Sequence, residues 1–447
     1  MDGKTSTLKD SADDGDGDAV GGLLRSSSAA ATIVTSLGRQ RQQKQHRLPL
    51  PLFNFSIPAE SVAQVFFFRH YSMAGSNRLY AVQGSSEVPT VKMLGILAVG
   101  MAGLANSERD HGVMALARRK YGSTLHSIND AIKVRSEVTK ESTVAAVTLM
   151  AMFEIIACQD RSSMEAWVCH VQGAAALLRH WTPDDWDRAT NWRAYLHFFC
   201  LLAMSCIIRR TPVPTYVYEL AQSSPAFGSD AEIFPAKRLF RIICKFANLY
   251  SHEDTAHVTQ IAEKVSTAMS IEENLHSWKS ELSETWNYTT IQDDTGQVSG
   301  GSRHDYACAW QAYIWNHYRS CRILLHAVLL QYLDALALPV TKAHPALIAA
   351  YTSQQRASRD IISTMLLDIR ASVSYILGLY DKSKGNISLS PEHSGVFGLL
   401  GSIQALVGVV DVGDEDVGWL SEMLGFIGSS LGVGQALVLA NRLREKS

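Results

Sequence analysis

The stretch VAAVTLMAMFEIIA, residues 144–157, does most to decide the fold of this chain. It is apolar on every face of a helix, and helices of that kind lie at the centre of a protein. Thr139 is placed to cap the start of this helix, and Glu141 falls in the first turn, where the helix dipole favours a negative charge. The sequence therefore predicts a central buried helix that begins after Thr139.

The segments that follow this stretch carry the same helical signature. Residues 162–180 hold an apolar stripe in which successive members are spaced by four, three and four residues: Trp167, Val171, Ala174 and Leu178. Residues 192–208 and 306–336 predict further apolar helices, whereas residues 293–302 are rich in Gly, Ser and Asp and predict a loop. Every strong pattern in the body of the chain is thus helical.

The chain from residue 53 to residue 447 shows no alternating run that is long enough to require a sheet. It also shows no repeat at a fixed period, so a regular solenoid is not expected. We predict an all-α fold, a large irregular multi-helix domain over residues 53–447. Two sub-blocks, residues 53–215 and 236–447, are a further division that the sequence suggests.

Residues 1–52 form a low-complexity tail that is acidic first and basic later. Aspartates gather before residue 19, and the run RQRQQKQHR occupies residues 39–47. Such polar composition cannot recover its ordering entropy by burying apolar surface, so we predict a disordered tail. The basic run suits a nuclear-import signal or a nucleic-acid contact, with a solvated tail and a mitochondrial transit peptide as alternatives.

The charges of the chain nearly cancel. The 41 Lys and Arg residues stand against 43 Asp and Glu residues, for a formal net charge of -2. This balance argues against a dedicated nucleic-acid-coating surface, although it leaves room for a small basic patch. Residues 93–105 and 396–410 are apolar but shorter than the roughly 18–20 residues of a membrane span, so we predict buried core helices and no membrane association.

The seven cysteines are scattered through apolar stretches, and no C-x-x-C pair occurs. This distribution predicts buried free thiols, with neither a disulfide framework nor a zinc site. The chain also lacks a Gly-rich phosphate loop, a G-x-S-x-G elbow and an H-E-x-x-H motif. We therefore predict no catalytic residue, no metal ligand and no cofactor.

A few polar and aromatic residues remain to be interpreted. Glu154 is a lone carboxylate in an apolar helix, where burial tends to raise its pKa, and a structural ion pair or hydrogen bond is the favoured role. His170 lies beside the apolar stripe and is interpreted as a hydrogen-bonded boundary histidine. Cys169 cannot pair with it as a nucleophile, because adjacent helical residues point about 100° apart.

The aromatic residues gather in two parts of the sequence. One group includes Trp181, Trp186, Trp192, Tyr195, Phe198 and Phe199, and the other includes Trp278, Trp286, Tyr288, Tyr306, Trp310, Tyr313, Trp315 and Tyr318. Core packing is the favoured interpretation of both groups. A pocket for an apolar ligand or partner is the alternative.

Several motifs together resemble the middle regulatory region of the fungal zinc-cluster (six-cysteine binuclear zinc) transcription factors. Residues 165–178, EAWVCHVQGAAALL, resemble the signature Trp-x-x-His-x-x-Gly-Ala-x-x-Leu-Leu of that region. Residues 149–156, 275–279, 315–325, 368–373 and 419–440 resemble its other segments. The resemblance marks ten residues with structural roles: Glu154, Trp167, His170, Gly173, Ala174, Leu177, Trp278, Trp315, Tyr318 and Arg319.

The resemblance implies a nuclear regulator or co-regulator of transcription, specific to a pathway such as a fungal secondary-metabolism gene cluster, that acts through a helical effector domain. Members of the family begin with six cysteines that bind two zinc ions and carry the DNA contacts, whereas no cysteine precedes Cys158 here. Either the head has been lost or the sequence lacks its beginning. No DNA-binding residue is assigned, and direct sequence-specific DNA binding is not expected.

Partners follow from the same resemblance. We expect protein partners, either a DNA-binding relative or the transcription machinery, and a small-molecule effector is a further candidate. Two rival classes stay open, because a fold alone says little about function. One is a non-catalytic helical scaffold, which the localisation of a tagged protein would separate. The other is an enzyme that acts on an apolar metabolite, which would need convergent polar groups in a pocket.

Overall fold

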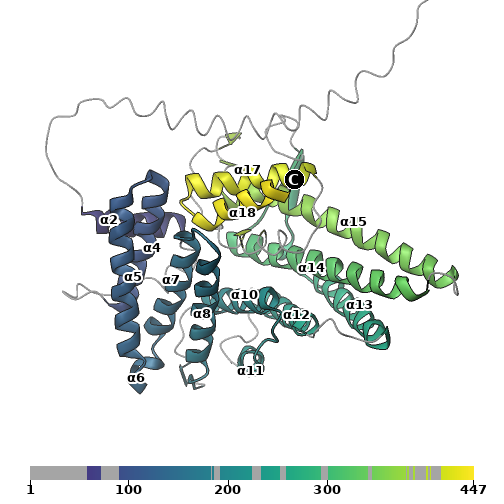
Figure 1. Cartoon of the computed structure of the whole chain (residues 1–447), viewed down its shortest axis with the longest axis horizontal. Helices are drawn as coiled ribbons and strands as arrows, with labels where there is room; N and C mark the ends of the chain where they lie inside the picture. Colours follow the sequence, from purple (N-terminus) through teal and green to yellow (C-terminus); the bar gives the residue numbers. More distant parts are fainter. Residues whose placement is uncertain are drawn as a thin grey trace, which may run out of the picture.

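The computed structural model describes residues 58–71, 90–182, 184–185, 192–223, 233–251, 258–292, 301–340, 345–378, 380–381, 386–387, 399–400, 403 and 414–446. This part of the chain is almost entirely helical (Figure 1), as predicted. The predicted disordered tail, residues 1–52, and most of the predicted loop at 293–302 lie outside the described residues.

The elements run in chain order as follows: α2 (Ala59–His70), α4 (Val91–Glu108), α5 (His111–Ala131), α6 (Arg135–Val138), α7 (Glu141–Ile156), α8 (Arg161–Leu178), α10 (Trp192–Arg209), α11 (Thr215–Ser223), α12 (Phe234–Ser251), α13 (Val258–Ser280), the 3₁₀ turn η2 (Glu284–Trp286), β1 (Thr289–Gln292), β2 (Ser302–Asp305), α14 (Ala309–Val340), α15 (Pro345–Ile376), β3 (Tyr380–Asp381), β4 (Asn386–Ile387), α17 (Asp414–Ser430) and α18 (Gly434–Lys446). The strands form two antiparallel pairs, β1 with β2 and β3 with β4. They are too short for their patterns to stand out in the sequence.

Helix α7 is the buried centre that the sequence predicts. From residue 143 to its end at Ile156, only Glu154 is not buried. Glu141 lies in the first turn as expected, but Thr139 does not cap this helix. Thr139 instead ends the short helix α6, and Lys140 occupies the N-cap position of α7 without a side-chain hydrogen bond. The prediction missed α6 because four residues are too few to show a helical period.

Helices α2, α4, α5, α7 and α8 lie together in one half of the molecule (Figure 1). Helix α4 packs against α2, α5 and α7, and α8 packs against α7. Residues 95–103 of α4 are all buried, so the prediction of a core helix at 93–105 is confirmed. Of the other apolar segment, 396–410, the structure describes Leu399, Leu400 and Ile403, which are buried.

The two ends of the described chain meet at one junction. Helices α17 and α18 form a hairpin against α4 and α7 (Figure 1). Within this junction, the Tyr71 hydroxyl donates to the Leu431 carbonyl at 2.7 Å, and the Asn106 amide donates to Gly432 O at 2.9 Å. Gly432 has a φ of +70°, and a Cβ there would lie 2.2 Å from Gly103 O. The contact therefore requires glycine at residue 432.

The other half of the molecule is built from α12 to α15 (Figure 1). Helices α13, α14 and α15 pack in sequence, α12 packs against α10, α13 and α14, and the β1–β2 hairpin lies against α15. Buried hydrophobic residues from Ala63 to Leu443 join in a single cluster that spans both halves. Among the described helices, one stretch, 309–337 in α14, is long and apolar enough to cross a membrane, but 67% of its most apolar 18 residues are buried inside the protein.

Candidate functional site

Two clusters of polar side chains contain most of the residues that the sequence singled out. The first, the rim cluster, joins Tyr121 of α5, Glu154 of α7 and His170 of α8. The Tyr121 hydroxyl lies 2.5 Å from Glu154 Oε1 and 2.9 Å from His170 Nε2. Tyr121 has one proton, which it donates to the carboxylate, so it accepts a hydrogen bond from His170 Nε2–H. One tyrosine thus ties three helices together.

The rim cluster is only partly shielded from solvent. The side chains of His170 and Glu154 are 18% and 14% exposed, and His170 Nε2 lies 3.7 Å from Glu154 Oε1. Burial, followed by the hydrogen bond to Glu154, raises the pKa of Tyr121 well above its usual value. The ring of Tyr121 also stacks on Phe153 at 4.4 Å. The predicted structural role of Glu154 and His170 fits this arrangement.

The other residues of the α8 signature differ in burial. Trp167 and Ala174 are buried, whereas Leu177 is half-buried and Gly173 is exposed. The indole N–H of Trp167 has no hydrogen-bond partner among the described residues. A Cβ on Gly173 would meet only Val147 Cγ1, at an ordinary 3.9 Å. Gly173 therefore faces no tightly packed neighbour, and Ala174 is the buried small residue of the pair.

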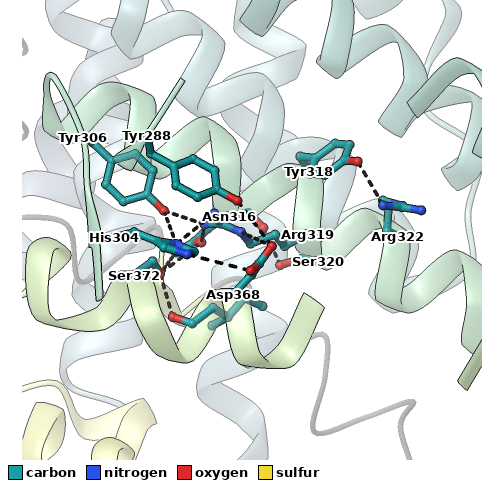
Figure 2. Close-up of polar contacts among 11 residues, drawn as sticks. Tyr288, His304, Tyr306, Asn316, Tyr318, Arg319, Ser320, Arg322, Asp368 and Ser372 are labelled. Carbon is teal, nitrogen blue, oxygen red and sulfur yellow. Dashed lines mark hydrogen bonds and ion pairs between the residues drawn. The ribbon is translucent and has the colours of Figure 1, made fainter. Parts of the chain in front are cut away.

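The second cluster, the Arg319 cluster, surrounds a guanidinium that is fully buried (Figure 2). Its members come from α14, α15 and the segment around the β1–β2 hairpin: Tyr288, His304, Tyr306, Asn316, Arg319, Asp368 and Ser372. Arg319 Nη1 donates to Tyr306 OH and to Asn316 Oδ1, each at 2.7 Å. Arg319 Nη2 lies 3.2 Å from His304 Nδ1. Three parts of the chain, α14, α15 and the segment around the β1–β2 hairpin, thus converge on one side chain.

Aromatic rings enclose the same guanidinium. Its central carbon lies 4.9 Å from the centre of the Tyr288 ring, 5.6 Å from that of Trp315 and 5.9 Å from that of Tyr306. Rings at these distances attract a cation through their negative faces, most strongly where water is excluded. The Arg319 cluster therefore stabilises its charge with rings as well as with hydrogen bonds.

The Arg319 cluster contains one ion pair between permanently charged groups, Arg319 and Asp368. Burial opposes the charge on Arg319, but Tyr306, Tyr288 and Asp368 hold its pKa above the usual value. Asp368 Oδ2 lies 3.7 Å from Arg319 Nε, and its side chain is 26% exposed. Burial, followed by the nearby Arg319 charge, lowers the pKa of His304 to about 3. A neutral His304 can then accept a hydrogen bond through Nδ1, which suits the donor on Arg319.

The predicted residues Trp278, Trp315 and Tyr318 pack beside the Arg319 cluster. The Trp278 ring stacks on Tyr318 with centres 5.0 Å apart, and it meets Trp315 edge-on at 5.3 Å. The indole N–H groups of Trp278 and Trp315 donate to Pro235 O and Trp286 O, at 2.7 and 2.9 Å. Core packing, the favoured interpretation of the second aromatic group, is what these contacts show.

A neighbouring network has the composition of a hydrolase triad. His326 Nδ1 lies 3.1 Å from Ser358 Oγ, and His326 Nε2 lies 3.2 Å from Glu272 Oε2. Glu272 also accepts from Arg322, whose Nη1 donates to Tyr318 OH at 3.1 Å. Ser358 and His326 are fully buried between helices α14 and α15. A nucleophile must reach its substrate, so this network serves packing and does not support an enzyme.

The ten predicted residues therefore do not form one site. Glu154 and His170 meet through Tyr121, while Trp278, Trp315, Tyr318 and Arg319 meet in the other half of the molecule. Tyr121, His304 and Glu272 could not be singled out from the sequence, because their partners lie more than 30 residues away or on a different element. Asp368 begins one of the segments quoted for the family resemblance, and this was the signal that could have found it.

Metal and thiol chemistry find no support in the described part of the chain. There, no group of three His, Cys, Asp or Glu side chains lies close enough to hold a metal ion. Each of the seven cysteines is free, and five are buried.

Comparison with known proteins identifies a family for most of the chain. A family model described as fungal specific transcription factor domain matches residues 57–379. The matched range contains both the rim cluster and the Arg319 cluster, and it ends before the α17–α18 hairpin. A search of curated proteins and a search of solved structures found no match.

Proposed function

This chain belongs to the fungal specific transcription factor domain family, and from that membership we propose that it is a pathway-specific, non-enzymatic regulator of transcription that acts in the nucleus. The observation that carries the proposal is the extent of the family match, residues 57–379. It includes the central helix α7, the α8 signature and the Arg319 cluster, which are the features that organise the fold. A role in the regulation of transcription is what the family supports.

We propose that the helical domain works through protein partners. The 447 residues contain no six-cysteine cluster, so no residue of this sequence is assigned to reading bases. Sequence-specific contact with a promoter would then come from a DNA-binding relative, or from the transcription machinery, bound to this domain. A small-molecule effector that binds the helical domain is a further part of the proposal.

A mobility-shift assay tests the partner-based mechanism. Purified chain is mixed with promoter fragments of candidate target genes, alone and together with a candidate DNA-binding relative. We expect sequence-specific retardation only when the relative is present, with a further shift on addition of this chain. Specific binding by this chain alone would contradict the mechanism.

Localisation tests whether the protein acts in the nucleus. A fluorescently tagged chain should gather in the nucleus under conditions in which its target genes respond. A tagged chain that stays outside the nucleus in every growth condition would favour the scaffold alternative.

A further inference from the structure

Helix α12 has an unusually basic outer face. Its sequence, FPAKRLFRIICKFANLYS, contains four cationic residues and no acidic residue, within a chain whose net charge is -2. The inner face is buried against neighbouring helices and includes Leu239, Phe240, Ile243 and Phe246. The cations consequently share the solvent side of the helix.

Three of these cations form a line. Lys237, Arg241 and Lys245 are spaced by four residues, so each lies about 6 Å further along the helix than the one before. Arg241 and Lys245 are exposed, and neither has an acidic partner among the residues that the structure describes. Lys237 is half-buried, and this burial, followed by the neighbouring charge of Arg241, lowers its pKa.

The fourth cation of α12, Arg238, does not belong to this line, and other charges lie near the helix. Arg238 forms a two-point ion pair with Glu281, at 2.5 and 3.0 Å, so its charge is already balanced. At the other end of α12, the Arg210 guanidinium lies 4.7 Å from the centre of the Tyr250 ring, which adds a positive charge beside the helix. Glu219 of α11 is the exposed acid on the neighbouring element.

We propose that the α12 basic face, composed of Lys237, Arg241 and Lys245, binds the phosphate backbone of duplex DNA without regard to sequence. Repeated cations along an exposed helix suit a polymer with regularly spaced charges, because such contacts release the counterions that surround nucleic acid. Arg and Lys side chains make these phosphate contacts, which position a protein on DNA and carry no sequence information. The inference rests on the proposed function, and it adds a second contact beside the one made by a DNA-binding partner.

An acidic peptide is the competing occupant, and the surface favours it less. Acidic amphipathic segments dock by placing their apolar side chains in an apolar groove. Phe234, at the start of α12, is the large hydrophobic residue that this helix exposes in the described part of the chain. One aromatic side chain beside a line of charges offers little apolar surface, whereas phosphates need only the charges.

Fluorescence anisotropy with the full chain tests the proposal. Labelled duplexes of three unrelated sequences are titrated at several salt concentrations. We expect similar affinity for each sequence. We also expect the logarithm of the association constant to fall linearly with the logarithm of the salt concentration. In the triple variant Lys237→Gln, Arg241→Gln, Lys245→Gln, the slope should become less steep by about 2 to 3, since each lost phosphate contact removes about 0.9. Binding at low salt should weaken about tenfold or more.

A matched control removes the same charge elsewhere. The triple variant Arg119→Gln, Arg135→Gln, Arg356→Gln changes three exposed arginines on α5, α6 and α15. It should keep the affinity and the salt slope of the unmodified chain. The single variant Arg241→Gln, compared with Arg241→Lys, repeats the test with the least disturbance, and only the first should lower the slope.

Three results would overturn the proposal. These are unchanged duplex binding in the α12 triple variant, an equal loss in the control variant, or binding of a labelled acidic peptide at α12 by a chain that does not bind duplex. The assay uses purified chain and no promoter, so its failure is distinguishable from failure of the proposed regulatory function.

Discussion

The rim cluster and the Arg319 cluster use the same kinds of groups in different surroundings. Each joins a tyrosine, a histidine and a carboxylate that come from different elements of the fold. In the rim cluster the side chains of His170 and Glu154 keep contact with solvent, whereas Arg319 is fully buried and its histidine, His304, is nearly so. Water can replace a lost partner in the first cluster, whereas in the second it reaches the Asp368 carboxylate, which is 26% exposed, but not the Arg319 guanidinium.

This difference determines how much stability a substitution in each cluster is expected to remove. A buried charge that loses its partners, or a buried partner that loses its charge, retains the full penalty of desolvation. A partly exposed group recovers most of that penalty from solvent. The Arg319 cluster should therefore dominate the stability of its half of the molecule, and the rim cluster should adjust the packing of α5, α7 and α8.

The largest effect should come from Arg319→Ala. The change leaves Tyr306, Asn316 and His304 without their buried donor, and we expect a loss of about 3–5 kcal/mol in the free energy of unfolding. Urea denaturation of the full chain measures it, with the exposed Arg356→Ala as a control that should change little. A loss below about 1 kcal/mol for Arg319→Ala would remove the contrast between the two clusters.

Acid sensitivity should come next in size. The pKa of His304 is about 3 in the folded chain, below the ordinary value of 6.5, so its contribution to stability is complete above pH 6.5. That contribution is lost as the pH falls from 6.5 toward 3, at up to about 1.4 kcal/mol per pH unit. His304→Asn keeps an acceptor for Arg319 and removes the titration.

Unfolding free energies measured between pH 7 and 4.5 decide this point. The His304→Asn variant should lose stability less steeply than the unmodified chain over that range. Parallel curves for the two proteins would show that His304 does not remain neutral in the folded chain.

The rim cluster should respond more weakly. Tyr121→Phe keeps the ring against Phe153 and removes the hydroxyl that joins Glu154 to His170. We expect a loss of about 1 kcal/mol, because solvent can reach the groups left behind. Denaturation under the same conditions as for Arg319→Ala gives the direct comparison. An equal loss of unfolding free energy in both variants would contradict the distinction between the two clusters.

The smallest expected effect is a gain. Gly173→Ala adds a methyl group at an exposed helical position with room for it, and we expect about 0.5–1 kcal/mol of added stability from helix propensity. Gly103→Ala is the matched opposite, because its Cβ would lie 2.0 Å from the Tyr71 hydroxyl. That variant should be clearly destabilised. A loss in Gly173→Ala would mean that the signature glycine has a role beyond packing.

The sequence was sufficient to predict the helical fold and the buried centre. Residues 144–157 are apolar on every face of a helix, and the apolar stripe of α8 repeats at the helical period. Both are local properties that can be read without the tertiary structure. The resemblance likewise marked Arg319 and Trp315 through a local motif. The strands β1 and β2 and helix α6 could not be predicted, because each of these elements is only four residues long.

The polar clusters were harder to predict for a different reason. Tyr121 contacts Glu154 and His170 across 33 and 49 residues, and Asn316 contacts Ser372 across 56. Periodicity shows which face of a helix is buried, but not which helix covers it. The α12 basic face combines both situations, since its charges are local, whereas the lack of an acidic partner for Arg241 and Lys245 in the described part of the chain is a property of the fold.

Promoter occupancy combined with transcript profiling tests the central claim, that this helical chain regulates transcription. Chromatin from cells that express the tagged full chain is immunoprecipitated, and transcripts are compared between cells with and without the gene. We predict enrichment at the promoters of a small set of genes whose transcripts change when the chain is removed. Absence of enrichment at every promoter, together with an unchanged transcript profile, would contradict the account.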